Sequence, residues 1–140
     1  MNRETIIEAF AQRVYACADF LTRGRRLQHW NKVTDQPAVF IRHVSDHYDR
    51  AQGILPRLTL NLEIWIYSRA GADPHVAPDS GLNDLVDSVE AALAPDNAML
   101  RTLTLGGLVQ HCWLEGEVMF DPGDLDAQAK CVLPVKILVP

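Results

Sequence analysis

Residues 57–68 read Arg-Leu-Thr-Leu-Asn-Leu-Glu-Ile-Trp-Ile-Tyr-Ser, and this stretch decides the fold class. Leucine or isoleucine alternates with polar or aromatic residues through five repeats. This period of two predicts a β-strand with one buried face. The residues expected to be buried are Leu58, Leu60, Leu62, Ile64 and Ile66. The opposite face carries Trp65 and Tyr67, two large aromatic side chains that need a cover, either from a helix of the same chain or from another subunit.

A second strand is expected before this one, at residues 38–44, where Gln36-Pro37 opens a run of β-branched and aromatic residues. The polar segment 45–56 is predicted to be the loop between the two strands. A further loop is predicted at residues 69–80, which contain two prolines and a glycine.

The last third of the chain is also expected to be β-structure. Strand segments are predicted at residues 103–105, 108–120 and 129–139, and the last of these again alternates with a period of two. Pro134 interrupts it and cannot donate a hydrogen bond to a neighbouring strand. The final strand is therefore predicted to lie at a sheet edge or to carry a bulge.

Two amphipathic helices complete the pattern. The first spans about residues 3–18 with Asn2 as N-cap, and the second spans residues 81–93 with Ser80 as cap. In the first, apolar residues recur at spacings of three and four, and in the second at spacings of three, one, three and four, so that each helix carries one apolar stripe. The predicted order is α-β-β-α-β-β-β, an α+β fold in which two helices pack on one face of a mostly antiparallel sheet.

Length and composition are typical of a single globular domain over residues 1–140, since 48% of the residues are hydrophobic and 22% are charged. No run approaches the roughly 18 apolar residues that a membrane span needs. The first residues lack the apolar block and cleavage site of a signal peptide. We therefore expect the protein to be made and kept in a cytoplasm, with no membrane partner.

Charge is divided unevenly along the chain. Residues 1–60 contain nine Lys/Arg and six Asp/Glu, whereas residues 61–140 contain four and twelve. The net charge of −5 argues against sequence-independent DNA binding by one subunit. The asymmetry fits two solvated faces, and it also fits opposite charges that meet between neighbouring copies.

Two groups of residues were tested as metal sites, and neither has suitable spacing. His43 and His47 lie four apart, but they are expected at a strand end and in a loop, with no Glu between them. Asp121, Asp124 and Asp126 surround an Asp-Pro-Gly turn and lack the alternate spacing and distal Glu of a calcium loop. We expect no bound metal.

No catalytic arrangement is evident either. His111 and Cys112 are adjacent, so a strand directs their side chains to opposite faces. The sequence contains no phosphate-binding glycine loop and no GxSxG motif. Three cysteines without a CxxC spacing argue against a closed disulfide framework. The sequence therefore predicts a protein that is not an enzyme and needs no cofactor.

Several short blocks occur in a recognisable order. The central block is Thr104-Leu105-Gly106-Gly107-Leu108-Val109, which is followed by Cys112 and by Glu115-Gly116-Glu117. Around it lie the strand start Gln36-Pro37-Ala38-Val39-Phe40, the strand end Trp65-Ile66-Tyr67 and the closing run Leu133-Pro134-Val135-Lys136-Ile137. In this order, over nearly the whole chain, the blocks resemble the tail terminator proteins of long-tailed bacteriophages.

The resemblance implies an α/β fold that assembles as a ring, usually a homohexamer, on the finished tail tube. Such a ring stops polymerisation of the tube protein and presents a surface to the head-completion or connector protein. DNA passes through its lumen without sequence-specific binding, and an acidic lumen would keep the phosphates from sticking. The implied location is the neck region of the virion tail, after assembly in the host cytoplasm.

This interpretation nominates two sets of residues. The first consists of candidates for the subunit interface, namely Arg23, Arg25, Arg26, Trp65, Tyr67, Glu115 and Glu117. The second consists of candidates for the ring rims in the loops 45–56, 69–80 and 121–128, namely Asp49, Arg50, Asp73, His75, Asp121 and Asp124. The arginine cluster could instead contact a nucleic-acid backbone or form a solvated helix end.

Other functions stay open at this point. The chain could be another neck or minor tail protein of similar size. It could also be a small cytoplasmic module with a ligand bound at the Trp65–Tyr67 face, or a hydrolase without a recognisable motif. A stable monomer would favour the ligand-binding module.

Overall fold

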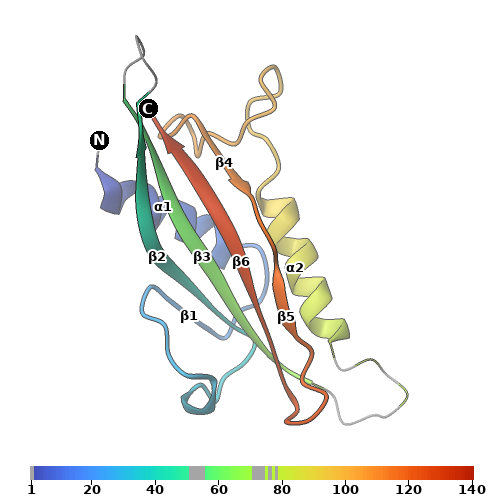
Figure 1. Ribbon diagram of the computed structural model, residues 1–140. Helices are drawn as coiled ribbons and strands as arrows, with labels where there is room; N and C mark the ends of the chain where they lie inside the picture. Colours follow the sequence, from blue (N-terminus) through green and yellow to red (C-terminus); the bar gives the residue numbers. More distant parts are fainter. Residues whose placement is uncertain (1, 51–55, 71–74, 76, 78) are drawn as a thin grey trace.

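The structure is a computed structural model that describes residues 2–50, 56–70, 75, 77 and 79–140. Its elements follow the order α-β-β-β-α-β-β-β, with one additional 3-10 helix, η1 (Figure 1). They are α1 (Arg3–Tyr15), β1 (Thr22–Gly24), η1 (Trp30–Lys32), β2 (Ala38–Asp49), β3 (Arg57–Arg69), α2 (Ser80–Ala92), β4 (His111–Leu114), β5 (Met119–Asp121) and β6 (Gln128–Val139). The predicted α+β class is confirmed, and β1 is a strand that the sequence pattern did not indicate.

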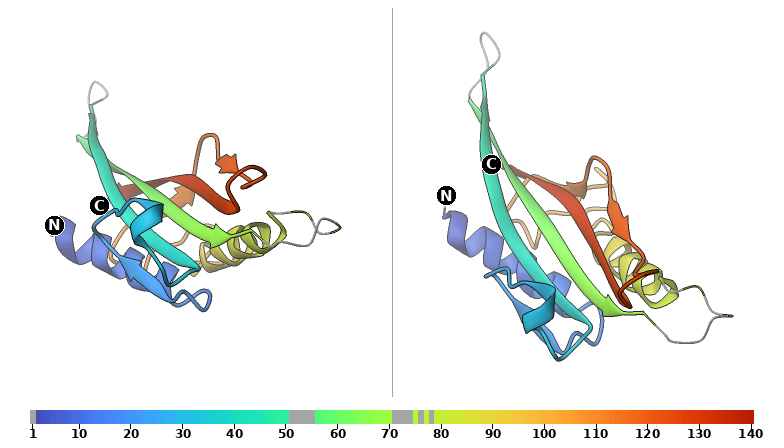
Figure 2. Two further views of the ribbon diagram at one scale, coloured as in Figure 1. Left: turned by 90° about the horizontal axis from the view of Figure 1, so that it is seen from below. Right: turned by 60° about the horizontal axis from the view of Figure 1, so that its bottom comes forward.

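The strands form one mixed sheet in the order β1-β2-β3-β6-β4, and β5 pairs with β6 beside β4. Only the β1–β2 pairing is parallel, while the other pairings are antiparallel. Both helices cover the same face of the sheet, α1 on the side of β2 and α2 beside β3 and β6 (Figure 2). This is the predicted two-layer arrangement.

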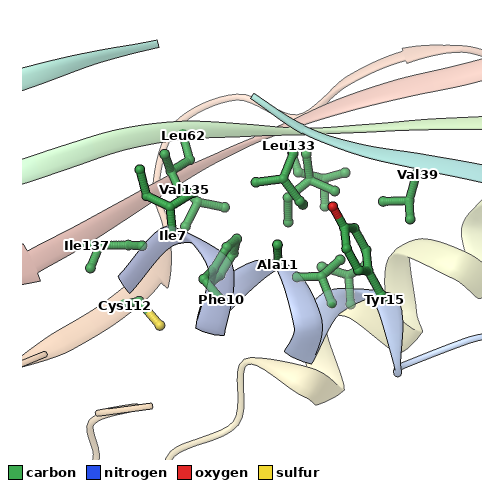
Figure 3. Close-up of a cluster of buried hydrophobic side chains, with 14 of the residues drawn as sticks. Ile7, Phe10, Ala11, Tyr15, Val39, Leu62, Cys112, Leu133, Val135 and Ile137 are labelled. Atoms are coloured by element: carbon green, nitrogen blue, oxygen red, sulfur yellow. The ribbon is translucent and has the colours of Figure 1, made fainter. Parts of the chain in front are cut away.

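The core confirms the prediction from the alternating stretch. Leu58, Leu60, Leu62, Ile64 and Ile66 are all buried, with at most 8% of their surface exposed. Side chains of α1 such as Ile7 and Phe10 point toward the strands that carry Leu62, Leu133 and Val135 (Figure 3). Full burial of one such side chain contributes about 1.5–3 kcal/mol, so this layer is a main source of stability.

The final strand does not lie at the edge of the sheet, so that prediction is wrong. β6 pairs with β3 along its whole length and with β4 and β5 on its other side. Pro134 lies between the residues of β6 that pair with β5 and those that pair with β4. The carbonyl of Pro134 accepts a hydrogen bond from the N–H of Glu115. In a strand the nitrogen and the carbonyl of one residue face the same neighbour, so the nitrogen of Pro134 faces the break between β4 and β5. The missing donor is tolerated there.

Helix ends differ from the predictions by a few residues. Asn2 is the N-cap of α1, and its side chain accepts from the N–H of Thr5 at 3.2 Å, as expected. The helix ends at Tyr15, since Cys17 donates to Val14 in a tighter turn. In α2 the N-cap is Asp79 and not Ser80. Ser80 is already the first helical residue, which leaves it unable to cap.

Two predicted boundaries in the β-structure are also wrong. β2 continues to Asp49, so residues 45–49 of the predicted loop belong to a strand. A register shift between His43 and Ser45 inserts one extra residue, and beyond it the side chains of β2 alternate in the opposite sense. Residues 103–105 form no strand, and the predicted strand 108–120 is divided into β4 and β5. Gly116, with a φ of 116°, lies in the break between them.

Candidate functional site

The aromatic side chains on the outer face of β3 are covered by the chain itself. Tyr67 is 3% exposed and packs with Phe40 and Val33, and its hydroxyl donates to the carbonyl of Gln28 at 2.7 Å. The cover is the segment that contains η1, not one of the two α-helices, which both lie on the other face. Tyr67 is therefore part of a small second core and is closed to a neighbouring subunit.

Trp65 lies at the border of this covered region and is only half-buried. Its indole N–H donates to Glu63 at 3.1 Å. A hollow of about 290 Å³ adjoins it and is lined by Met119, Phe120, Val132 and other residues of β5 and β6. Met119 and Phe120 are 57% and 45% exposed, so apolar surface is accessible at this edge of the sheet.

The three arginines of the predicted interface have different environments. Arg25 is engaged within the chain, because its guanidinium contacts Glu4 at 2.7 Å and Glu8 at 3.1 Å on α1. Burial opposes the charge of Arg25, but the hydrogen bonds that its guanidinium donates to the two carboxylates outweigh this effect and raise the pKa of Arg25. A hydrogen bond from Gln12 and then that of Arg25 lower the pKa of Glu8. Arg25 thus ties β1 to α1.

Arg23 and Arg26 remain exposed on either side of Arg25. Neither forms an ion pair within the part of the chain that the structure describes. Lys32, at the end of η1, is also exposed and unpaired there. Arg23 lies in β1 and Arg26 follows it closely, at an edge of the sheet where β1 has a neighbour on one side only, whereas Lys32 belongs to η1 on the outer face.

Glu115 and Glu117, the predicted acidic partners, lie in the break between β4 and β5 and are exposed. Glu115 has neighbours within the chain, since Lys136 lies 3.6 Å from its carboxylate and the indole N–H of Trp113 donates to it at 3.4 Å. The structure does not bring either glutamate near the arginine cluster, which lies at the opposite edge of the sheet.

The predicted rim residues are spread over both ends of the sheet. Asp49 belongs to β2 and pairs with Arg57 at 3.1 Å, and Arg50 follows it on the surface. Asp121 lies 3.4 Å from Lys130, while Asp124 is exposed in the turn that follows β5. In the second loop, His75 is exposed and Asp73 lies outside the described residues.

An acidic helix face was missed by the sequence reading. Asp84, Asp87 and Glu90 are exposed on α2 at spacings of three, which places them on one side of the helix. None forms an ion pair with a described residue. The sequence does indicate an acidic surface here, because residues 70–100 contain six Asp/Glu and no Lys/Arg.

A polar cluster at the N-terminal end of α1 was missed as well. Arg3 bonds Asp46 at 2.8 Å and also the hydroxyl of Tyr48, and His43 bonds Asp46 at 2.6 Å. Burial of Asp46 opposes its charge, but these bonds outweigh it and lower the pKa of the carboxyl. The register shift in β2 turns Asp46 and Tyr48 toward α1. Simple alternation along the sequence would place these two side chains on the opposite face, so the sequence pattern could not predict the cluster.

The described residues contain no group of three His, Cys, Asp or Glu side chains that could hold a metal ion. Cys112 and Cys131 are buried, and burial raises the pKa of each thiol to about 12, so neither is poised as a nucleophile. His111 stacks on Trp113 on the face opposite Cys112, as the strand geometry predicted. No helix within the described ranges is long and apolar enough to cross a membrane.

Comparison with known proteins adds no assignment. No model of a protein family matches the chain, and no curated protein is similar to it.

Proposed function

We propose that this chain is a virion structural protein that forms a ring, caps the tail tube of a long-tailed bacteriophage and joins it to the head-completion protein. The ordered blocks that resemble tail terminators support this proposal, and the α+β fold is compatible with it. In this reading the protein is not an enzyme and needs no cofactor.

The observation that carries the proposal is that the two edges of the sheet are chemically different. A head-to-tail ring needs two dissimilar patches on each subunit, because the contact is heterologous. β1 lies at one edge with unpaired arginines, and β4 and β5 lie at the other with exposed apolar side chains. Open edges of this kind are where a further copy most readily joins.

The block Thr104–Val109, which resembles tail terminators, forms a turn held by side-chain hydrogen bonds. Asp96 accepts hydrogen bonds from the backbone N–H and the hydroxyl of Thr104 and from the N–H of Gly106. The turn exposes Leu108 beside Ile6 and Pro140, which line a hollow of about 300 Å³. An ordered apolar surface at one end of the sheet suits contact with another protein of the tail.

Native mass measurement of the purified protein, alone and with purified tail tube, tests the proposal. We expect a closed ring in at least one of these conditions, with six copies as the first expectation. A monomer under both conditions would contradict it.

A second candidate is a small ligand-binding module, favoured by the hollow of about 290 Å³ beside Trp65. Its volume is near the lower limit of typical ligand sites, which are about 300–1,000 Å³. A monomer whose tryptophan fluorescence changes on addition of a small aromatic compound, and whose Trp65→Ala variant loses that response, would favour this candidate.

A further inference from the structure

The two lateral sides of the molecule end in surfaces of opposite charge. On one side, β1 and the residues directly after it expose a pair that we call the basic edge, composed of Arg23 and Arg26. On the other side, α2 exposes a set that we call the acidic edge, composed of Asp84, Asp87 and Glu90 (Figure 1). β1 forms one end of the sheet, whereas α2 packs on β3 and β6, toward the other end, which β4 forms.

The charges of both edges are uncompensated within the part of the chain that is described. Arg25 is excluded from the basic edge because Glu4 and Glu8 already bind it. On α2 the carboxylates repel one another at their spacing of three residues. Glu90 also lies near the C-terminal end of the helix, where the helix dipole disfavours an anion. These charges weaken α2 on its own, and an external cation would relieve them.

Exposed apolar side chains accompany the charges on both sides. Leu21 is 67% exposed and directly precedes β1, which carries Arg23. Met119 and Phe120 are exposed on β5, at the side of the sheet where α2 lies. Large apolar side chains beside charges are typical of a protein interface rather than of a solvated face.

We propose that the acidic edge of one subunit binds the basic edge of the next copy of the same chain. The occupant is a second copy because one chain carries both complementary surfaces on opposite sides, where they cannot meet each other. The contact is heterologous and gives a ring when its rotation closes. This inference rests on the proposed ring and names its interface. The acidic partners of the arginines are then the carboxylates of α2 and not Glu115 and Glu117.

Charge reversal tests the contact. One variant carries Arg23→Glu with Arg26→Glu, and the other carries Asp84→Lys with Asp87→Lys. All four side chains are exposed, so both variants should fold as judged by circular dichroism. Each alone should assemble at least tenfold more weakly than the unmodified protein by sedimentation, because like charges then face each other across the contact.

Recombination of the reversed edges makes the test specific. An equimolar mixture of the two variants should assemble, since each edge again meets the opposite charge in an alternating ring. The chain with all four substitutions should assemble as well. Arg42→Glu with Arg101→Glu reverses the same number of exposed positive charges outside both edges and should leave the native mass unchanged.

The outcomes separate this interface from the ring itself. If the unmodified protein forms rings and both reversal variants form them equally well, the interface is wrong and the proposed function stands. If each variant fails alone and their mixture also fails, these edges do not meet, which again overturns the interface. If the unmodified protein stays monomeric with and without tail tube, the proposed function is wrong and the interface falls with it.

Discussion

The carboxylate of Asp96 accepts a hydrogen bond of 3.1 Å from the backbone N–H of Gly106, ten residues away in the sequence. It also accepts from the N–H of Thr104 at 2.7 Å, so one side chain holds the turn that contains Gly106-Gly107. Leu105, Gly106 and Gly107 all adopt positive φ in this turn, which gives the segment little stability of its own. Asp96 therefore fixes the shape of the block that resembles tail terminators.

Removal of this carboxylate should loosen the turn, most visibly near neutral pH. The backbone N–H groups of Gly106 and Thr104 lower the pKa of Asp96 in the folded protein. The stabilisation is thus present above the unfolded pKa of about 3.9 and is lost as pH falls through the folded value. Urea unfolding of Asp96→Asn and the unmodified protein should differ at pH 7 and converge toward pH 2. A constant difference over this range would contradict the assignment, and Asp19→Asn, at another exposed carboxylate, serves as the control.

Among the glycines that the structure describes, Gly123 should be the least tolerant of a side chain. Its φ is 80°, and a Cβ there would lie 2.8 Å from the backbone nitrogen of Ala129. Gly123→Ala should therefore cost more than the roughly 1–3 kcal/mol of backbone strain alone, since the backbone must also move. Gly107→Ala is the matched control, because its φ is also positive and no atom lies within 4 Å of a Cβ. Equal unfolding free energies for the two variants would show that the close approach is absent.

Leu62 should respond to truncation as a core residue. It is 1% exposed on β3, so Leu62→Ala should lower the free energy of unfolding by about 2–5 kcal/mol. Leu62→Asp buries an unpaired charge and should leave little soluble protein. Thr59→Ala, on the other face of the same strand, is the control and should change stability far less. A well-folded Leu62→Asp variant would show that the faces are reversed.

The cysteines should differ in their reactivity toward iodoacetamide. Cys112 and Cys131 are buried with thiol pKa values of about 12, so few of their thiols are ionised or accessible at pH 8. Cys17 is half-buried, and burial raises its thiol pKa as well. Mass spectrometry should find slow labelling that begins at Cys17, with all three cysteines labelled in urea. Rapid labelling of Cys112 or Cys131 in the native protein would contradict their burial.

Strong local patterns made most of the fold predictable from the sequence. The alternation in residues 57–68 and 129–139 and the stripes of the two helices depend only on which face each residue occupies. β1 was missed because three residues carry too little pattern, and it is held by pairing with β2 and by the link from Arg25 to Glu8. Pro134 was misplaced because the break between β4 and β5 depends on tertiary contacts.

The candidate interface was less predictable than the fold. Charge counts along the chain indicated a basic first part and an acidic remainder, but not which charges pair within one subunit. Arg25 is neutralised by Glu4 and Glu8, while Arg23 and Arg26 stay exposed, a distinction that only the folded chain reveals. The sequence could not single out the acids of α2, because helical spacing alone does not show whether a cation of the same chain lies beside them.

The length of tail tubes assembled in the presence of this protein tests the proposed ring most directly. Tail tube protein should be polymerised alone and with increasing amounts of the chain, and tube lengths measured by negative-stain electron microscopy. A cap that binds the growing end should shorten the mean tube length in proportion to its concentration and appear as a ring at one end of each tube. Tubes of unchanged length, with no extra density at either end, would contradict the proposed function.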